Sequence, residues 1–311
     1  MQHTRERLIG GIEAGGTKFN CVLARSPERV LARATLATTR PEQTLAEVGA
    51  FFAQQAREHG TPEAIGLASF GPVELNRGAS NFGHITNTPK PDWSDIPIVR
   101  TLARELGVPV AFETDVNGAA LGEGFGCGAA AGLEHYAYVT IGTGIGAGLI
   151  SNGRPIQGFS HPEVGHMRVP RHPDDQFSGR CPFHGDCLEG LACGPALADR
   201  WSVDPGGLPA DHPAWAIEAH YLAALCWNLT CLFAPQRIIL GGGVMQADGL
   251  LDRVRADFEA LSGDYFQALE SAAAHPYLAR PGHGGRSGEI GALLLAERLL
   301  ANKREHGGQG Q

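Results

Sequence analysis

Apolar residues along this chain follow first the period of a strand and then that of a helix. Residues 8–23 are largely apolar except around Glu13–Lys18, which predicts a strand, a turn and a second strand. Residues 136–150 repeat this design around Gly142–Gly148. Two such hairpins, each opening a sheet of its own, are typical of an internally duplicated α/β protein.

Helical spacing predicts an amphipathic helix over 44–59, where apolar side chains recur every three or four positions. Residues 214–233 are apolar nearly all round, so this helix is expected to be buried. No apolar run is expected to reach the roughly 20 residues of a membrane span. Further helices are predicted at 98–106, from 118, from 194, at 250–261, 265–274 and 289–303, and the tail 305–311 is expected to be disordered.

Three predicted strands end in residues suited to ligand binding. The strand 64–70 runs into Gly71, the strand 108–112 leads to Asp115, and the strand 237–240 leads to the run Gly241, Gly242 and Gly243. In open α/β sheets, ligands bind beyond the carboxyl ends of strands. Asp115 is equally well explained as the N-cap of the following helix. The polar loop 76–93 suits a sugar or a solvated surface equally.

The first turn has the composition of an anion-binding loop. Gly15 and Gly16 allow backbone N–H groups to face an anion, and Thr17 and Lys18 add a hydroxyl and a charge. A plain hairpin turn is the alternative, because the segment matches neither the dinucleotide fingerprint nor a Walker loop.

Metal-ligating residues gather between 166 and 187. Cys181, His184 and Cys187 have C-x2-H-x2-C spacing, and His166 lies fifteen residues upstream of Cys181. Thiolates and imidazoles in a set of four suit tetrahedral zinc, and a closed set of protein ligands indicates a structural ion. A Cys181–Cys187 disulfide is the weaker alternative, since nothing else looks secreted. Two acids, Glu163 and Glu189, lie beside these ligands.

Composition narrows the class of protein. A chain of 311 residues with 43% hydrophobic and 19% charged residues suits two globular domains. The net charge of −8 without a basic block argues against nucleic acid or an acidic membrane as a partner. Five of the seven cysteines, those at 21, 127, 193, 226 and 231, are expected to be buried reduced thiols in a cytoplasmic protein. The N-terminus does not resemble a signal peptide.

In this order, the motifs resemble the ROK family of sugar kinases, and bacterial fructokinases within it. The resemblance spans nearly the whole chain: 11–19, 69–72, 87–93, 114–117, 142–146, Glu163-x-Gly-His166, the cysteine cluster and 241–243. It implies the duplicated actin-like ATPase (ribonuclease H-like) fold, with two α/β domains and a central cleft. The small domain would cover 1–117 with the helix 289–304 returning to it, and the large domain 118–288.

The resemblance also implies an activity: transfer of a phosphoryl group from ATP with Mg²⁺ to a hexose, most closely D-fructose, with Asp115 as general base. Such chemistry needs mainly positioning and charge neutralisation, and the base needs no shifted pKa. The implied hexose ligands are Gly71, Thr88, Glu163, His166 and Glu189. ATP would bind the turns of Gly15, Gly16, Thr17 and Lys18, of Gly142, Thr143 and Gly144, and of Gly241, Gly242 and Gly243. His166, Cys181, His184 and Cys187 would hold structural Zn²⁺, and the protein would be a homodimer.

This chain departs from many family members at two positions. Glu13 replaces an Asp in the first turn, and Thr114 replaces the Asn before the proposed base. Both departures occur in fructokinase-like members and favour fructose over glucose. The alternatives are a kinase for mannose, glucose or N-acetylmannosamine, a non-catalytic sugar-sensing ROK repressor, and a zinc-stabilised structural protein. Too few residues precede the first strand for a DNA-binding helix-turn-helix.

Overall fold

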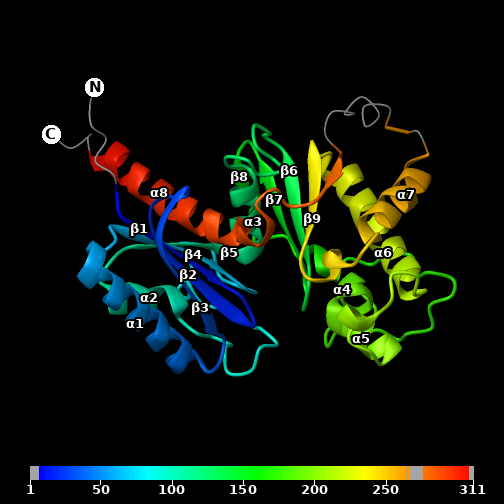
Figure 1. Cartoon of the computed structure of the whole chain (residues 1–311), viewed down its shortest axis with the longest axis horizontal. Coiled ribbons are helices and arrows are strands. Elements are labelled where there is room, and N and C mark those ends of the chain that lie inside the picture. Colours follow the sequence, from blue (N-terminus) through cyan, green and yellow to red (C-terminus); the bar gives the residue numbers. More distant parts are fainter. Residues whose placement is uncertain (1–6, 264, 267–275, 308–311) are drawn as a thin grey trace. The chain divides into compact units, whose positions relative to one another are not determined.

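The protein folds into two compact units, seen here in a computed structural model that describes residues 7–263, 265–266 and 276–307 (Figure 1). Unit 1 comprises residues up to Gly128, the segment Gln157–His161 and the chain from His283 onward. Unit 2 comprises Ala129–Ile156 and Pro162–Gly282.

Unit 1 is built on a five-stranded sheet of order β3-β2-β1-β4-β5. Its strands are β1 (Ile9–Ala14), β2 (Lys18–Ser26), β3 (Arg29–Ala37), β4 (Ala64–Ser69) and β5 (Val110–Thr114). The first three form an antiparallel meander, whereas β1, β4 and β5 run parallel. The helices of unit 1 are α1 (Pro41–His59), α2 (Ile98–Leu106), α3 (Asp115–Glu123) and α8 (Ser287–Gly307).

Adjacent glycines in β1 show how the helices cover both faces of this sheet. A Cβ on Gly10 would lie 2.7 Å from the ring of Phe52 in α1, and a Cβ on Gly11 would lie 3.2 Å from Leu293 in α8. Because side chains of successive strand residues point to opposite faces, α1 and α8 lie on opposite sides of the sheet. Both sides are buried, which is why β1 and β4 are apolar except for Glu13 and Ser69 near their carboxyl ends.

Glycines also allow α3 and α8 to cross at very short range. A Cβ on Gly291 would lie 1.7 Å from the carbonyl oxygen of Gly118, and one on Gly122 would lie 2.0 Å from that of Ser287. This packing assigns α3 to unit 1, and the units divide at Gly128. The boundary expected between residues 117 and 118 falls inside α3.

Unit 2 repeats the topology of unit 1. Its sheet has the order β10-β9-β6-β7-β8, from β6 (Tyr136–Ile141), β7 (Ile145–Ser151), β8 (Arg154–Pro155), β9 (Arg237–Gly241) and β10 (Leu278–Ala279). As in unit 1, the first three strands are antiparallel and the later strands run parallel to the first. The predicted α/β class and internal duplication are therefore confirmed.

The helical elements of unit 2, except η2, contribute buried residues to one large core. They are η1 (Val164–His166), α4 (Leu188–Ala192), α5 (Gly194–Trp201), η2 (Pro205–Gly207), α6 (Ala214–Phe233), η3 (Val244–Gln246) and α7 (Leu250–Ser262); η5 (Gly284–Arg286) precedes α8 in unit 1. Within the described part of the chain, α6 is the one helix long and apolar enough to cross a membrane. It qualifies by length and average composition only, since polar residues such as Glu218 and His220 interrupt its apolar stretches. As predicted, α6 is largely buried.

The local predictions differ from the structure in a few places. β3 was missed, because its exposed arginines and threonine interrupt the apolar pattern. The helix predicted at 265–274 lies mostly outside the described residues. The tail expected to be disordered begins inside α8, which continues to Gly307, and residues 308–311 are likewise outside.

Candidate active site

The carboxyl ends of three parallel strands in unit 1 lie level with one another. The strand register pairs Ala14 with Ser69 and Ser69 with Thr114, and Phe70 N–H donates to the Ala14 carbonyl at 2.7 Å. Beyond these strand ends lie the first glycine turn, Gly71 (after Phe70) and Asp115. Three predicted parts of the site therefore lie together at the carboxyl ends of the parallel strands.

The first glycine turn is fixed by the end of β3. Thr38 Oγ1 donates to the Gly15 carbonyl at 2.7 Å, and Thr38 N–H donates to the Thr17 carbonyl at 2.9 Å. A Cβ on Gly15 would lie 2.9 Å from the Lys18 carbonyl oxygen, while one on Gly16 meets no atom within 4 Å. Thr17 and Lys18 are exposed, as an anion-binding turn requires.

Asp115 occupies the first turn of α3, but it does not cap the helix. The N-cap is Thr114, whose Oγ1 accepts the Asn117 N–H at 3.1 Å. The Asp115 carboxylate accepts the Val116 N–H at 2.9 Å. The interpretation of Asp115 as the N-cap is therefore wrong. Its partly buried carboxylate lies at a strand end and is not used to cap the helix.

The pKa of Asp115 is raised to about 6, chiefly because burial penalises its charged form. The hydrogen bond from Val116 opposes this shift, and the charge of Glu13 adds to it. Such a carboxylate accepts a proton more readily than an ordinary aspartate, although no shift was required by the sequence argument.

Glu13 lies beside the start of α8. It accepts from Asn20 Nδ2 at 2.8 Å, and a Cβ on Gly288 would lie 2.2 Å from its other oxygen. Burial raises the pKa of Glu13, and the hydrogen bond from Asn20 partly offsets this. The glutamate that departs from the common family pattern thus packs against Gly288, and a side chain at that position of α8 would require Glu13 to move.

Sequence reasoning gave no role to Glu113. Its Oε1 accepts both the Thr114 N–H and the Asn117 side-chain N–H, each at 2.9 Å. Glu113 therefore braces the turn between β5 and α3 on either side of Asp115. The four-residue separation of Glu113 and Asn117 was the available signal, because a chain entering a helix brings such side chains together.

The predicted hexose ligands of unit 1 lie in irregular segments. Gly71 precedes a cis proline, and Val73 N–H donates to His161 Nε2 at 3.3 Å. Thr88 is 7% exposed, and its hydroxyl oxygen accepts the Lys90 N–H at 3.3 Å. The loop 76–93 is irregular, as predicted.

In unit 2, the sheet brings the other two glycine turns together. β6 and β9 run parallel with Thr140 beside Gly241, so the turns after both strands leave the same edge. Gly242 has φ +92°, and its Cβ would lie 2.3 Å from the Ile141 carbonyl oxygen. Thr143 and Gly243 are exposed.

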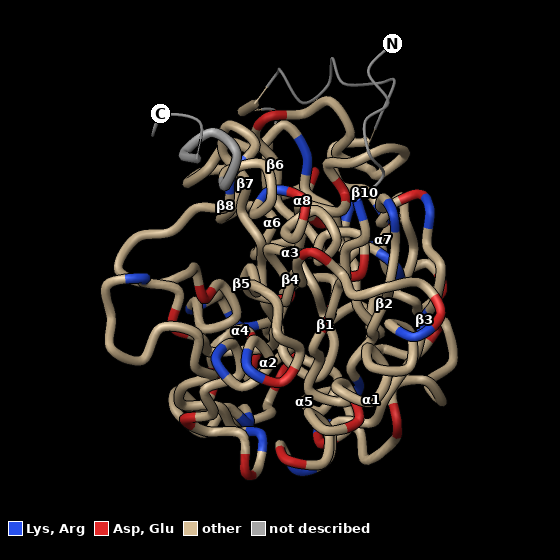
Figure 2. The backbone as a smooth tube through the Cα atoms, turned by 90° about the vertical axis from the view of Figure 1, so that its left-hand side faces the viewer, with Lys and Arg blue, Asp and Glu red and all other residues tan. Residues whose placement is uncertain are grey.

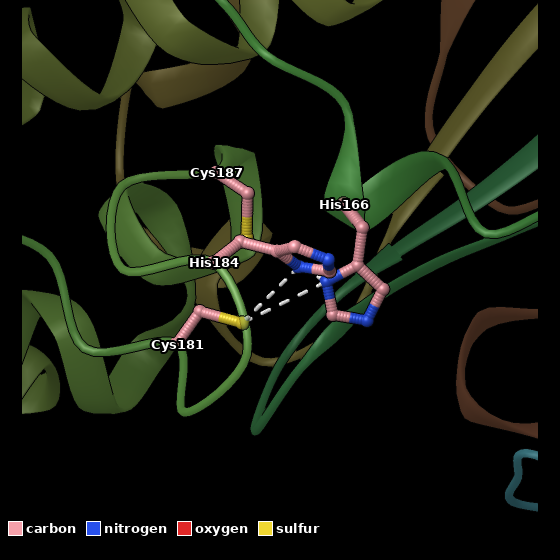
Figure 3. A group of neighbouring side chains, drawn as sticks. All are labelled: His166, Cys181, His184 and Cys187. Carbon is pink, nitrogen blue, oxygen red and sulfur yellow. Dashed lines mark hydrogen bonds between the residues drawn. The ribbon is translucent and has the colours of Figure 1, made fainter.

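The four predicted zinc ligands converge. The ligand atoms of His166, Cys181, His184 and Cys187 all lie within 4.8 Å of one another (Figure 3). His166 Nδ1 is 3.8 Å from Cys181 Sγ and 3.5 Å from Cys187 Sγ. Tetrahedral zinc with its usual bond lengths needs ligand separations of roughly 3.6 Å. The donor set therefore fits zinc in both chemistry and spacing.

Short local elements hold these ligands. His166 ends η1, Cys187 precedes α4, and reciprocal hydrogen bonds between Cys181 and Gly185 at 3.0 and 2.9 Å close the turn that carries His184. Because His166 faces both thiols through Nδ1, its Nε2 is directed away from the cluster. The same imidazole can thus ligate a metal and hydrogen-bond to a hydroxyl.

The two acids beside the cluster differ in environment. Glu163 is exposed at the start of η1. Glu189 lies in the first turn of α4, half-buried, and its Oε2 accepts the Ile145 N–H at 2.9 Å. Sequence reasoning assigned Glu189 to a sugar but missed this contact with the second glycine turn.

A family model, described as the ROK family, matches residues 9–299. The chain belongs to the ROK family. A fructokinase from Zymomonas mobilis is 43% identical, with 94% of this chain and 97% of the relative covered. A fructokinase from Pediococcus pentosaceus is 41% identical, with 95% and 99% covered. The resemblance inferred from the motifs is therefore confirmed.

Solved structures place the chain in the same ROK fold. A ROK hexokinase from Thermus thermophilus superposes with a TM-score of 0.75 at 29% identity, and the match covers 95% of this chain and 99% of that one. The predicted actin-like ATPase class is thus confirmed. Within this ROK protein, Asp115 and the first turn belong to unit 1, and the metal cluster with the other two turns belongs to unit 2.

Proposed function

We propose that this protein is an ATP-dependent hexose kinase that converts D-fructose to fructose 6-phosphate. The observation that carries the proposal is the identity of 41–43% over nearly full length to two fructokinases. The ROK hexokinase of known structure is 29% identical, which favours fructose over a general hexose activity.

Asp115 is the proposed general base. Its carboxylate would accept the proton of the attacking hexose hydroxyl as the new phosphorus–oxygen bond forms. The pKa of about 6 leaves it ionised near neutrality and makes it a better proton acceptor than an ordinary aspartate. Thr114 and Glu113 support this role by fixing the turn from which the carboxylate projects.

The proposed hexose ligands are Gly71, Thr88, Glu163, His166 and Glu189, and the proposed ATP-binding residues are Gly15, Gly16, Thr17, Lys18, Gly142, Thr143, Gly144, Gly241, Gly242 and Gly243. Bound Mg²⁺ would neutralise phosphate charge. Glycine turns serve phosphates because their backbone N–H groups are accessible. Structural Zn²⁺ on His166, Cys181, His184 and Cys187 would fix the segment that carries Glu189.

The proposed test is a panel of hexoses with Mg-ATP. We expect kcat/KM to be highest for fructose, with glucose, mannose and N-acetylmannosamine lower by at least about tenfold, the scale of a few unmatched hydroxyl contacts. Glucose turnover equal to or above that of fructose would overturn the fructose assignment but leave the kinase intact. No phosphorylation of any hexose would favour a sugar-sensing ROK protein.

We further propose a cytoplasmic homodimer without a nucleic-acid partner. Acidic and basic positions are interspersed along the described backbone (Figure 2), and the net charge is −8. A chain with this net negative charge does not attract phosphate backbones. Retained binding of duplex DNA at moderate salt would contradict this part of the proposal.

A further inference from the structure

The second glycine turn is gripped by the segment that carries the metal ligands. Glu189 lies two residues after Cys187, and its Oε2 accepts the Ile145 N–H at 2.9 Å. The carbonyl of the same residue, Ile145, faces Gly165, where a Cβ would lie 2.1 Å from its oxygen. Gly165 directly precedes His166, another metal ligand.

A third contact comes from the start of α5. Gly194 N–H donates to the Gly142 carbonyl at 2.8 Å, and Gly142 N–H donates to the Gly144 carbonyl at 2.9 Å. The turn is therefore held at Gly142 and at Ile145, on either side of the exposed Thr143.

Close packing makes the contact with Glu189 sensitive to small changes. A Cβ on Gly144 would lie 2.6 Å from Glu189 Oε2, whereas one on Gly142 would meet no atom within 4 Å. Neither glycine has a positive φ, so an alanine at either position is tolerated by the backbone and differs only in what its methyl group meets.

We propose that Glu189 is a positioning residue that couples metal occupancy to the nucleotide-binding turn. One carboxylate oxygen, Oε2, fixes the Ile145 N–H, and the other remains for a hexose hydroxyl. The metal holds Cys187 and His166, and through Glu189 and Gly165 it holds the second glycine turn. This inference rests on the proposed function for the roles of hexose and nucleotide, but the coupling itself can be measured without either ligand.

The first experiment follows hydrogen exchange of the Ile145 amide by NMR, with Zn²⁺ bound and after chelation. Glu189→Ala removes the acceptor, and Glu189→Gln keeps an oxygen that can accept. We expect the exchange protection of Ile145 to fall about tenfold or more in Glu189→Ala and in the chelated protein, the size of a lost hydrogen bond to a charged group. Glu189→Gln should retain most of it. Unchanged protection in either perturbed protein would overturn the proposal.

The second experiment measures fructose binding by calorimetry with no nucleotide present. Gly144→Ala should weaken binding about tenfold, because its methyl group displaces Glu189. Gly158→Ala is the control, since Gly158 is outside the proposed binding residues and a Cβ there meets no atom within 4 Å; it should change the affinity less than about twofold. Equal effects of both variants would contradict the coupling. Wild-type protein that phosphorylates no hexose, yet loses Ile145 protection with its metal, would sink the kinase assignment and leave the coupling standing.

Discussion

The two glycine turns occupy equivalent places in the two sheets but are held by different means. In unit 1, the turn is anchored by Thr38, which directly follows the nine-residue strand β3. In unit 2, the equivalent strand β8 has two residues, and the turn is anchored by Glu189 and Gly194 from the long segment between β8 and β9. A repeated strand order therefore does not determine how its functional loops are supported.

The difference shows where a metal is useful. The turn beside the long strand β3 is supported by the residue that follows this strand, through one main-chain and one side-chain hydrogen bond of Thr38. A turn supported by an irregular insertion depends on whatever gives that insertion a fixed shape. The cluster of His166, Cys181, His184 and Cys187 supplies such a constraint in unit 2.

The largest expected effect concerns Asp115, which follows β5 in unit 1. The equivalent strand of unit 2, β10, is not followed by a carboxylate. Asp115→Asn keeps the shape of the side chain and removes its ability to accept a proton. Turnover should fall by ~10²-fold or more, with fructose affinity changed less than about threefold. Steady-state kinetics and calorimetry together make the measurement. A variant with near wild-type kcat would remove Asp115 as the base.

Substitution of a metal ligand tests how far unit 2 depends on its cluster. Cys187→Ser is expected to lose bound zinc and to lower the unfolding temperature by roughly 10 °C, because metal binding contributes folding free energy. Metal content and calorimetric melting are the measurements. The exposed Cys127 in unit 1 offers a control, and Cys127→Ser should change neither. A wild-type protein that folds without metal and keeps full activity would contradict the structural role.

The pH dependence of kcat/KM follows from the raised pKa of Asp115, about 6. The ionised carboxylate is the active form, so activity should be constant above this value and fall about tenfold per pH unit below it. Rates measured from pH 4.5 to 8 in one buffer system test this. An acidic limb that begins only near pH 4 would show that the base has an ordinary pKa.

The support of the first turn can be weakened by replacing one hydroxyl group with a methyl group. Thr38→Val removes the hydroxyl that donates to Gly15 while keeping the volume. We expect KM for ATP to rise about fivefold, the scale of one buried hydrogen bond, with little change for fructose. Thr38→Ser restores the hydroxyl and serves as the matched control. If Val and Ser behave alike, the hydroxyl does not support the turn.

Buried glutamates provide the smallest test of the comparison. Glu123 in unit 1 accepts from Ser287 Oγ at 2.5 Å, whereas neither oxygen of Glu218 in unit 2 has a hydrogen-bond partner among the described residues. Burial raises the pKa of Glu218 well above its ordinary value. Below the ordinary pKa of a glutamate, Glu218 is protonated in both the folded and the unfolded protein and costs no stability by ionising. As pH rises toward the raised pKa of the folded state, the free energy of unfolding declines.

Glu218→Gln should accordingly stabilise the protein by about 1 kcal/mol at pH 8 and change little at pH 4, because the amide cannot ionise. Glu123→Gln should give no gain at either pH. Denaturant unfolding at both pH values is the measurement. A destabilising Glu218→Gln at pH 8 would show that the carboxylate has an ionic role in unit 2.

Local sequence patterns predicted much of this molecule. The strand-turn-strand repeat at 8–23 and 136–150 predicted the duplication, and the C-x2-H-x2-C spacing predicted ligands that converge. These features depend on neighbours in sequence or on motifs with one chemical purpose.

Contacts between distant segments were not predictable in this way. The bond from Ile145 to Glu189 joins residues 44 positions apart, and the crossing of α3 with α8 depends on glycines whose partners lie far along the chain. The raised pKa of Asp115 arises from burial and from Glu13, which is remote in sequence. No periodicity encodes such pairs.

The crossing of α8 with the unit 1 sheet has a consequence for synthesis on the ribosome. Leu293 and Ala296 of α8 cover Ile9, Val22 and Ala64, residues made more than two hundred positions earlier. All of unit 2 leaves the exit tunnel before α8 does. One face of the first sheet therefore stays without its covering helix until the whole of the second unit has been synthesised.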